Sequence, residues 1–327
     1  GFYRDADYTK WKGFRLNAID GSTLKLPSNP NTIEHFGRQT GKEVPQSRIS
    51  SRYDVLNGIT IELIVSSIHA DERKMALEHL SKATSDDLII YDRGYPCFSL
   101  FSAHRNSGSQ FLMRLPRKFS KETTAFEASY LTENIITLAP NRPETKRRCI
   151  YSGASVEPIK IRLIKVELSD GNTEILATSL LDEVKYPYVD FKSLYALRWN
   201  VEEDFKTKKV WIELENFSCK SIESIYQDIY AKLFVQNLAG LIAWSAAPLI
   251  DDKYKNRVLD YKINKAQSLS KMKHCIAKLA SSSISNAIRA LIDIFVLTVE
   301  PIRPGRSYER KKKFRHRHFY PQYKTIR

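Results

Sequence analysis

Residues 195–209 read YALRWNVEEDFKTKK, and the interpretation of the whole chain starts from this stretch. Apolar residues recur here at steps of three, four and four, which predicts an amphipathic helix over about 190–209; they are Leu194, Leu197, Val201 and Phe205. One residue beyond each of them lies a polar side chain, namely Tyr195, Arg198, Glu202 and Lys206. At about 100° per residue, this second set forms a stripe beside the buried face. We therefore expect Glu202 at the edge of the core and Glu203 turned further toward solvent.

The spacing of Arg198 and Glu202 also fits an ordinary ion pair, because residues four apart on a helix are neighbours. Such a surface pair contributes well under ~1 kcal/mol and is common. For the helix taken alone, a structural role for Glu202 is the simpler interpretation. A role in chemistry depends on which side chains elsewhere in the sequence accompany it.

Two earlier segments place an acid at or near the end of an apolar strand. Residues 14–20, FRLNAID, alternate in polarity and end at Asp20, and the apolar run 88–92, LIIYD, ends at Asp92. Open α/β sheets bind ligands at the carboxyl ends of their strands, and carboxylates are ligands that Mg²⁺ prefers. Asp20, Asp92 and Glu202 are therefore candidate metal ligands. Shared carboxylates also suit the two-metal chemistry of phosphodiesters.

The order of elements indicates an α/β fold with a mixed sheet. Residues 52–67 predict a β-hairpin whose Asn57-Gly58 pair suits a type I′ turn, and residues 116–174 read as a β-rich insertion. Helical patterns follow at 221–246 and 268–297. The expected parts are the first part of the core at 1–115, the insertion at 116–174, the remainder of the core with the Glu202 helix at 175–246, a C-terminal helical region at 247–302 and a basic tail at 303–327.

Charge is concentrated at the end of the chain. The 52 Lys and Arg residues against 37 Asp and Glu give a net charge of +15, and residues 303–327 hold ten of the former and one of the latter. Such a segment attracts nucleic-acid phosphates through counterion release. Its candidate DNA contacts are Arg310, Lys311, Lys312, Lys313 and Arg315. The alternative is a solvated tail that keeps the protein soluble.

Composition excludes several other classes. The four cysteines lie singly, so a disulfide scaffold or zinc ribbon is excluded and a reducing cytoplasm is expected. The most apolar run, 233–250, carries Gln236 and Asn237 and is interpreted as a buried helix, with no membrane partner. The chain also begins without an export signal.

Tyr195, Arg198, Glu202 and Lys209 are separated by two, three and six residues. This spacing resembles the Tyr-Arg-Glu-Lys signature of a large group of bacterial DDE insertion-sequence transposases. Three further blocks agree: AIDGSTLKLP around Asp20, IIYDRGYP around Asp92, and RPGRSYERKKKFR at residues 303–315. The resemblance extends over most of the chain.

The resemblance implies an RNase H-like (retroviral-integrase-like) mixed-sheet core, with a β-rich insertion before the last catalytic helix and a C-terminal helical region. Asp20, Asp92 and Glu202 would form the DDE triad that holds two Mg²⁺ ions, with Mn²⁺ as a possible substitute. The implied phosphate contacts are Tyr195, Arg198 and Lys209. Arg93, beside Asp92, and Lys206, on the polar stripe, are further candidate DNA contacts.

The implied activity is cut-and-paste DNA transposition, in which transposon ends are cleaved and then joined to target DNA. The implied partners are double-stranded DNA and a second copy of the chain in a synaptic complex, in the bacterial cytoplasm and at the nucleoid. Two alternatives stay open: a nuclease of the same fold without strand transfer, and an inactive, truncated transposase that only binds DNA. The second arises because only about twenty residues precede Asp20, whereas family members normally carry an N-terminal helical region that recognises the transposon ends.

Overall fold

The computed structural model describes residues 2–167, 171–275 and 283–303, so nearly all of the predicted basic tail lies outside the described residues. The chain divides into two compact units. The first comprises Gly1–Thr23, Arg48–Leu56 and Thr60–Asp204, and the second comprises Leu24–Ser47, Asn57–Ile59 and Phe205–Arg327. All three candidate metal ligands belong to the first unit.

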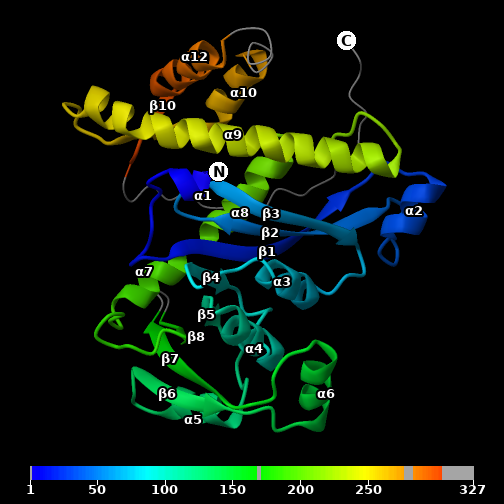
Figure 1. The fold of residues 1–327 in the computed structure, drawn as a ribbon, viewed down its shortest axis with the longest axis vertical. Helices are drawn as coiled ribbons and strands as arrows, with labels where there is room; N and C mark the ends of the chain where they lie inside the picture. Colours follow the sequence, from blue (N-terminus) through cyan, green and yellow to red (C-terminus); the bar gives the residue numbers. More distant parts are fainter. Residues whose placement is uncertain (1, 168–170, 276–282, 304–327) are drawn as a thin grey trace. The chain divides into compact units, whose positions relative to one another are not determined.

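The first unit is built on a mixed sheet. Its strands are β1 (Arg15–Lys25), β2 (Gln46–Asp54), β3 (Ile59–Ser67), β4 (Asp87–Tyr91), β5 (Gln110–Arg114), β6 (Glu133–Leu138), β7 (Ile159–Glu167) and β8 (Thr173–Thr178). They lie in the order β3-β2-β1-β4-β5-β8-β7-β6 (Figure 1). Strands β1, β4 and β5 are parallel, and β8, β7 and β6 extend the sheet in antiparallel pairs. This order is the one expected of an RNase H-like core, and it confirms the predicted fold class.

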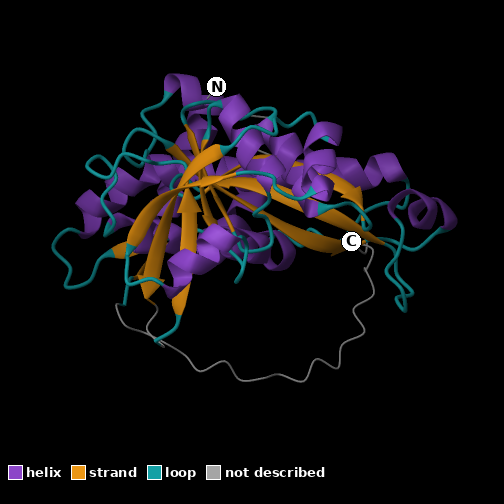
Figure 2. Cartoon of the chain, turned by 90° about the horizontal axis from the view of Figure 1, so that it is seen from below, coloured by secondary structure: helices purple, strands orange, loops and turns teal. Residues whose placement is uncertain are grey.

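Helices lie between most of these strands along the chain and at both ends of the series; Figure 2 draws helices in purple and strands in orange. They are α1 (Phe2–Asp5), α3 (Glu72–Leu80), α4 (Phe98–Ser107), α5 (Lys121–Ala128), α6 (Pro143–Tyr151), α7 (Asp190–Ala196) and α8 (Trp199–Lys206). Helix α3 begins where the Asp71 carboxylate accepts the amide of Arg73 at 2.8 Å, a standard N-cap. Helix α4 ends at Gly108, whose φ of 73° lies in the left-handed region that glycine tolerates.

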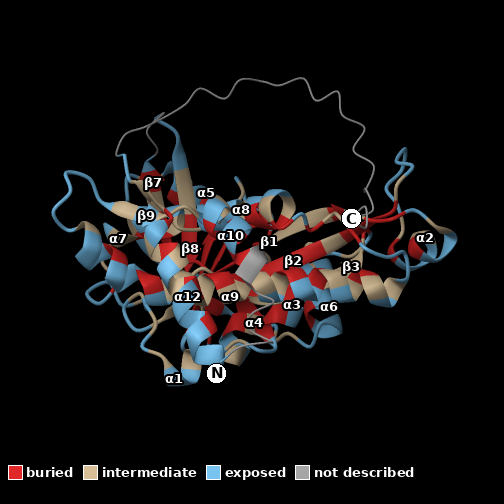
Figure 3. Ribbon diagram, turned by 90° about the horizontal axis from the view of Figure 1, so that it is seen from above, coloured by how far each residue is buried: buried red, intermediate tan, exposed pale blue. Residues whose placement is uncertain are grey.

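Both faces of the central strands are buried, as the red strands of Figure 3 show. On one face, Ile19, Ile89 and Phe111 share a core with α3 and α4. On the other, α7 packs over β7, where the guanidinium of Arg162 lies 5.2 Å from the Phe191 ring. Burial on both faces explains why the residues of β4 form the continuous apolar run seen in the sequence.

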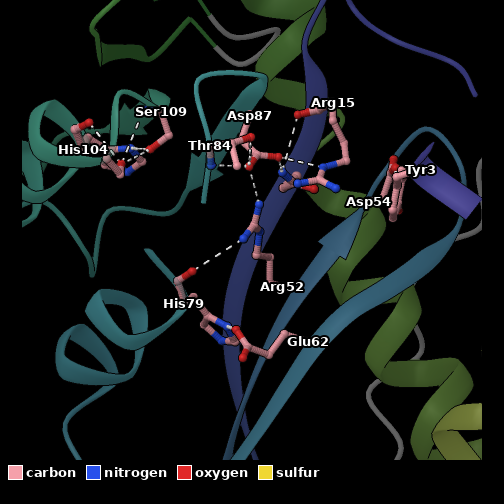
Figure 4. Close-up of polar contacts among 12 residues, drawn as sticks. Tyr3, Arg15, Arg52, Asp54, Glu62, His79, Thr84, Asp87, His104 and Ser109 are labelled. Carbon is pink, nitrogen blue, oxygen red and sulfur yellow. Dashed lines mark hydrogen bonds and ion pairs between the residues drawn. The ribbon is translucent and has the colours of Figure 1, made fainter. Parts of the chain in front are cut away.

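A buried ion network fixes β1, β2 and β4 against one another (Figure 4). The Asp87 carboxylate lies 2.7 Å from the guanidinium of Arg15 and 2.7 Å from that of Arg52, and it accepts the Thr84 amide at 2.8 Å. Burial alone would raise the pKa of Asp87, but the Arg15 hydrogen bond and the Arg52 charge outweigh it and lower the pKa to about 2. Asp87 therefore stays charged and holds the register of β1 and β4.

The turn between β2 and β3 differs from the prediction. The connection has four residues, Val55 to Gly58, and only Gly58 takes a positive φ, of 72°. A type I′ turn requires positive φ at both of its two central residues, so the predicted turn type is wrong although the hairpin is present. The Asp54 carboxylate accepts the Leu56 amide at 3.1 Å, which stabilises the longer turn.

The insertion between β5 and β8 contains helices as well as strands. Helix α5 begins with a capping box at Ser120 and Thr123, and α6 begins at Pro143. Strands β6 and β7 pair with each other, and β7 pairs with β8, so the insertion widens the core sheet.

The single helix predicted over 190–209 is interrupted. The amides of Leu197 and Arg198 bond the carbonyls of Leu194 and Tyr195, three residues back, and this tight turn separates α7 from α8. A π-helical turn, η1 (Thr207–Trp211), follows α8. Side-chain periodicity could not predict either feature, because both are changes in backbone hydrogen bonding.

The second unit is mainly helical. Its elements are α2 (Pro30–Phe36), α9 (Ile222–Tyr254), β9 (Tyr261–Ile263), α10 (Lys265–Cys275), α12 (Ile284–Leu297) and β10 (Val299–Pro301). Its core joins α9 to α12 through Ile242, Ala246, Leu291 and Phe295. Within the described residues, the pattern at 268–297 contains α10 and α12, and α9 extends eight residues beyond the predicted end at 246.

Helix α9 is long and apolar. It has 33 residues and a window of mean hydropathy 1.5, so by length and composition it could cross a membrane, and 28% of that window is buried. A core helix of a water-soluble protein passes the same test. The buried ammonium of Lys232 donates to the carbonyl of Glu213 at 2.9 Å, and α10 and α12 cover part of the helix. Interpretation of α9 as a core helix stays a prediction.

Candidate active site

The register of β1 and β4 brings Asp20 and Asp92 together. Ala18 stands opposite Ile90 in this parallel pair. Asp20 and Asp92 each follow two residues further along the chain, and the charge of Asp92 acts on Asp20. Neighbouring strands lie about 4.8 Å apart, and residues two apart on a strand point to the same face. Asp92 directly follows the last residue of β4, whereas Asp20 lies inside β1, which ends five residues beyond the predicted end.

Backbone amides orient both aspartates. Gly21 donates its amide to Asp20 Oδ1 at 2.8 Å, and Gly94 donates to Asp92 Oδ1 at 2.8 Å. Gly94 also requires its small size, because a Cβ there would lie 3.1 Å from Asp92 Oδ1. These contacts give a physical reason for the Asp-Gly and Asp-Arg-Gly sequences at the two strands.

Glu202 reaches the same region from α8 through an arginine. Arg198 Nη2 lies 2.7 Å from Glu202 Oε1, and Nη1 lies 3.9 Å from Asp20 Oδ2. The side chain of Glu202 is 35% exposed, that of Asp20 21% and that of Arg198 13%, so the cluster lies at the rim of the core. Glu203 is exposed, as the helical stripe predicts.

The electrostatics of Asp20 are set mainly by its burial. Burial raises the pKa of Asp20 to about 6, and the charges of Asp92 and Glu202 contribute in the same direction. The Gly21 amide and the Arg198 charge oppose this shift without cancelling it. Burial likewise raises the pKa of the Tyr195 hydroxyl to about 12.

The donor chemistry of this cluster suits a divalent cation, since it offers three carboxylates in a region where negative charge is only partly balanced. The oxygens are not yet gathered, however. Within the described ranges, no three Asp, Glu, His or Cys side chains lie close enough to hold a metal ion. Arg198 occupies only one carboxylate oxygen of Glu202, so binding of a metal ion through both oxygens would require that ion pair to open.

A cavity of about 860 Å³ lies beside Asp92, lined by the loop after β4, the end of β5 and the loop after it, Glu127 of α5, and the start of β8. Its arginines are Arg93, Arg114 and Arg117, and Arg114 pairs with Glu174 at 2.7 Å. The sequence indicated only Arg93. Arg114 and Arg117 end and follow β5, the parallel neighbour of β4, so the rule that placed Asp92 at a strand end could also have found them.

The other predicted DNA contacts are dispersed. Lys206 is exposed at the end of α8, and Lys209 lies half-buried in η1, where burial lowers its pKa. Trp199, which follows Arg198, is 48% exposed. Its position just after the tight turn between α7 and α8 explains this, because it falls outside the apolar stripe. The tail residues Arg310, Lys311, Lys312, Lys313 and Arg315 lie outside the described residues.

A sheet in this order, with acids at two adjacent parallel strands and a glutamate on a later helix, defines a protein of the RNase H-like class. Comparison with known protein families agrees with that class and identifies a family within it. The family model of the transposase DDE domain matches residues 11–238, and the chain belongs to this family.

Individual relatives are distant. The InsG transposase of insertion sequence IS4 from Escherichia coli K12 is 22% identical over 234 residues, which cover 70% of this chain and 52% of that protein. The transposase of IS231F from Bacillus thuringiensis subsp. israelensis is 21% identical over 291 residues, 76% of this chain and 60% of that protein. The chain thus spans between about half and three-fifths of these curated relatives. A cryo-EM structure of the piggyBac transposase synaptic complex with hairpin DNA matches 90% of this chain and 59% of that chain, with 12% identity and a TM-score of 0.47.

Proposed function

We propose that this chain carries the catalytic part of a DNA transposase, which cleaves transposon ends and transfers the freed strands into target DNA. The observation that carries the proposal is the convergence of Asp20, Asp92 and Glu202 in one partly buried cluster, through a strand register and the Arg198 contact. Membership of the transposase DDE domain family supports the reaction type.

Asp20, Asp92 and Glu202 would hold Mg²⁺, expected as two ions, with Mn²⁺ as a substitute. When bound, these cations activate the attacking oxygen and stabilise the leaving oxygen of a phosphodiester. The chain's own residues would position the DNA. Arg198, released from Glu202, would bind a phosphate with its two-pronged guanidinium, and Tyr195 would donate its hydroxyl to a phosphate oxygen.

The DNA path would follow the cationic groups around the cluster. Arg93, Arg114 and Arg117 line the cavity beside Asp92 and would bind the backbone of the strand that flanks the scissile phosphate. Lys206, Lys209 and the basic tail would add sequence-independent contacts. The expected partners are double-stranded DNA and a second copy of the chain in a synaptic complex, in the bacterial cytoplasm and at the nucleoid.

The test uses the full chain with Mg²⁺, a pre-cut duplex that carries the element's own terminal sequence, and a target plasmid. Joined products are expected from the wild-type chain. Asp92→Asn should lower joining by at least about 100-fold while salt-dependent binding persists, because loss of one electrostatic element typically costs ~10²–10³ in rate. Cleavage without joining would instead identify a nuclease, and binding without any turnover would identify an inactive DNA-binding form.

A further inference from the structure

Tyr95 closes the turn that carries Asp92, and its hydroxyl has no partner. The Tyr95 amide donates to the Asp92 carbonyl at 3.3 Å, and the side chain is 2% exposed. Its ring lies 5.4 Å from that of Tyr91, inside the core that also contains Ile19. Within the described part of the chain, the hydroxyl oxygen of Tyr95 is buried and makes no hydrogen bond. Such a group costs stability, so its presence calls for a physical reason.

The surroundings of this hydroxyl are acidic. Burial raises the pKa of Tyr95, and the charges of Asp20, Glu72 and Asp92 raise it further. Glu72 begins α3, bonds the guanidinium of Arg48 and lies so close to Gly21 that a Cβ there would come within 2.9 Å of its Cδ. An O–H group in this setting is a donor near carboxylates whose oxygens are turned to other donors. Asp20 and Asp92 each accept a glycine amide, and Asp20 also faces Arg198.

Metal binding is the change that would give Tyr95 a partner. The three acids must rearrange to share a cation, because no such group is gathered within the described residues. A carboxylate that turns during this rearrangement would have an oxygen available for the nearest buried donor.

We propose that Tyr95 is a positioning residue for the Asp20–Asp92 pair: its buried hydroxyl donates a hydrogen bond to one of these carboxylates when the pair holds a divalent cation. This inference rests on the proposed metal-dependent function. Donors to metal-bound carboxylates orient the ligand, and their removal typically weakens metal affinity or activity about 10–100-fold. The buried hydroxyl would lower the stability of the metal-free protein and would orient a carboxylate ligand in the metal-bound protein.

Tyr95→Phe tests this proposal because it removes one oxygen and keeps the ring. The metal-free variant should melt at the same temperature as the wild type or higher, because the unpartnered hydroxyl is gone. Its affinity for Mn²⁺, measured by calorimetry without DNA, should fall at least about 10-fold. The rise in melting temperature on adding Mn²⁺ should shrink accordingly.

Tyr91→Phe is the matched control, four residues earlier in the same core. The Tyr91 hydroxyl lies 3.0 Å from His104 Nε2, so its loss should lower the melting temperature and leave Mn²⁺ affinity unchanged. Equal Mn²⁺ affinity of the wild type and Tyr95→Phe would overturn the role of Tyr95 and leave the proposed function standing. Absence of Mn²⁺ binding by the wild type itself would overturn both.

Discussion

Arg198 is the residue on which the state of the site depends. Its guanidinium contacts Glu202 and faces Asp20, and so supplies the positive charge that a metal ion would otherwise bring. A DNA phosphate is a competing partner for this guanidinium, because both carboxylate and phosphate accept its paired hydrogen bonds. Binding of a phosphate by Arg198 would release Glu202 toward Asp20 and Asp92. The arrangement therefore couples DNA binding to assembly of the metal site.

Arg198→Met is expected to separate these two steps. Without the guanidinium, Glu202 is no longer held, so Mn²⁺ affinity in the absence of DNA should be unchanged or tighter. DNA cleavage should fall at least about 100-fold, because the phosphate no longer has a charged donor at this position. Calorimetry and a cleavage assay measure the two effects. Arg198→Lys should recover only part of the cleavage, since lysine lacks the planar fork; loss of Mn²⁺ binding in Arg198→Met would contradict the coupling.

His104 predicts a pH dependence of stability in the first unit. Its ring is buried between Tyr91 and Ser109, and burial lowers its pKa to about 3. The unfolded chain takes up a proton near pH 6.5, and the folded chain does so only near pH 3, so stability falls as the pH drops through that interval. For one proton, the free energy of unfolding changes by up to about 1.4 kcal/mol per pH unit. Melting temperatures from about pH 7 to about pH 5 should show a smaller decline in His104→Gln, and an equal decline would assign it to other groups.

The sequence identified the acids but not their neighbours. Asp20 and Asp92 follow from a strand pattern that ends on an acid, and Glu202 follows from helical spacing. Glu72 and Tyr95 depend on contacts between segments far apart in the chain, and no local pattern marks them. The Arg198 contact with Asp20 likewise joins residues 178 positions apart.

The order of helices and strands along the chain could be predicted, because each type of element has its own hydrophobic periodicity and its own capping or turn residues. The interruption at Leu197 and the π-helical turn η1 could not be predicted. In both, the backbone hydrogen bonds change from a spacing of four residues to one of three or five, and the side-chain pattern does not record that change. The length of β1 was also underestimated. The predicted strand ends at Asp20, yet the structure continues β1 to Lys25.

Gly240 shows how one close approach constrains α9. A Cβ at this position would lie 2.8 Å from the carbonyl oxygen of Gly58, at the tip of the β2–β3 hairpin. Alanine is favoured over glycine inside a helix by ~1 kcal/mol, so Gly240→Ala should stabilise an isolated helix. In this protein it should instead lower the melting temperature, because backbone cannot yield as a flexible side chain does. Thermal denaturation of Gly240→Ala and the wild type tests this prediction. A higher melting temperature of the variant would show that the hairpin tip moves away without cost.

Over the full length of the chain, charge is divided between a folded part and a tail. Residues 304–327 hold nine Lys and Arg and one Glu, so more than half of the net +15 belongs to less than a tenth of the chain. The candidate catalytic acids and the cavity arginines lie elsewhere, in the first unit. Overall affinity for DNA and the chemistry at the scissile phosphate should therefore respond to different changes.

A variant that ends at Arg303 tests this division. Its affinity for duplex DNA should fall at low salt, and the plot of log affinity against log salt should become shallower by about 0.9 for each phosphate that the tail neutralises. Cleavage at saturating DNA should change little, because Asp20, Asp92 and Glu202 are retained. Fluorescence anisotropy at several salt concentrations measures the slope. An unchanged slope would mean that the tail does not touch DNA.

The ion network around Asp87 sets a constraint on how this protein can be recombined with its relatives. Arg15 and Asp87 form a buried ion pair at the start of β1 and β4. Asp20 lies five residues after Arg15, and Asp92 lies five residues after Asp87. Removing one residue from either interval would turn that strand's reactive acid to the opposite face, however well the flanking sequence matched. Chimeras with relatives should therefore remain active only when every crossover preserves the length of both intervals. Arg15 must be inherited together with Asp20, and Asp87 together with Asp92.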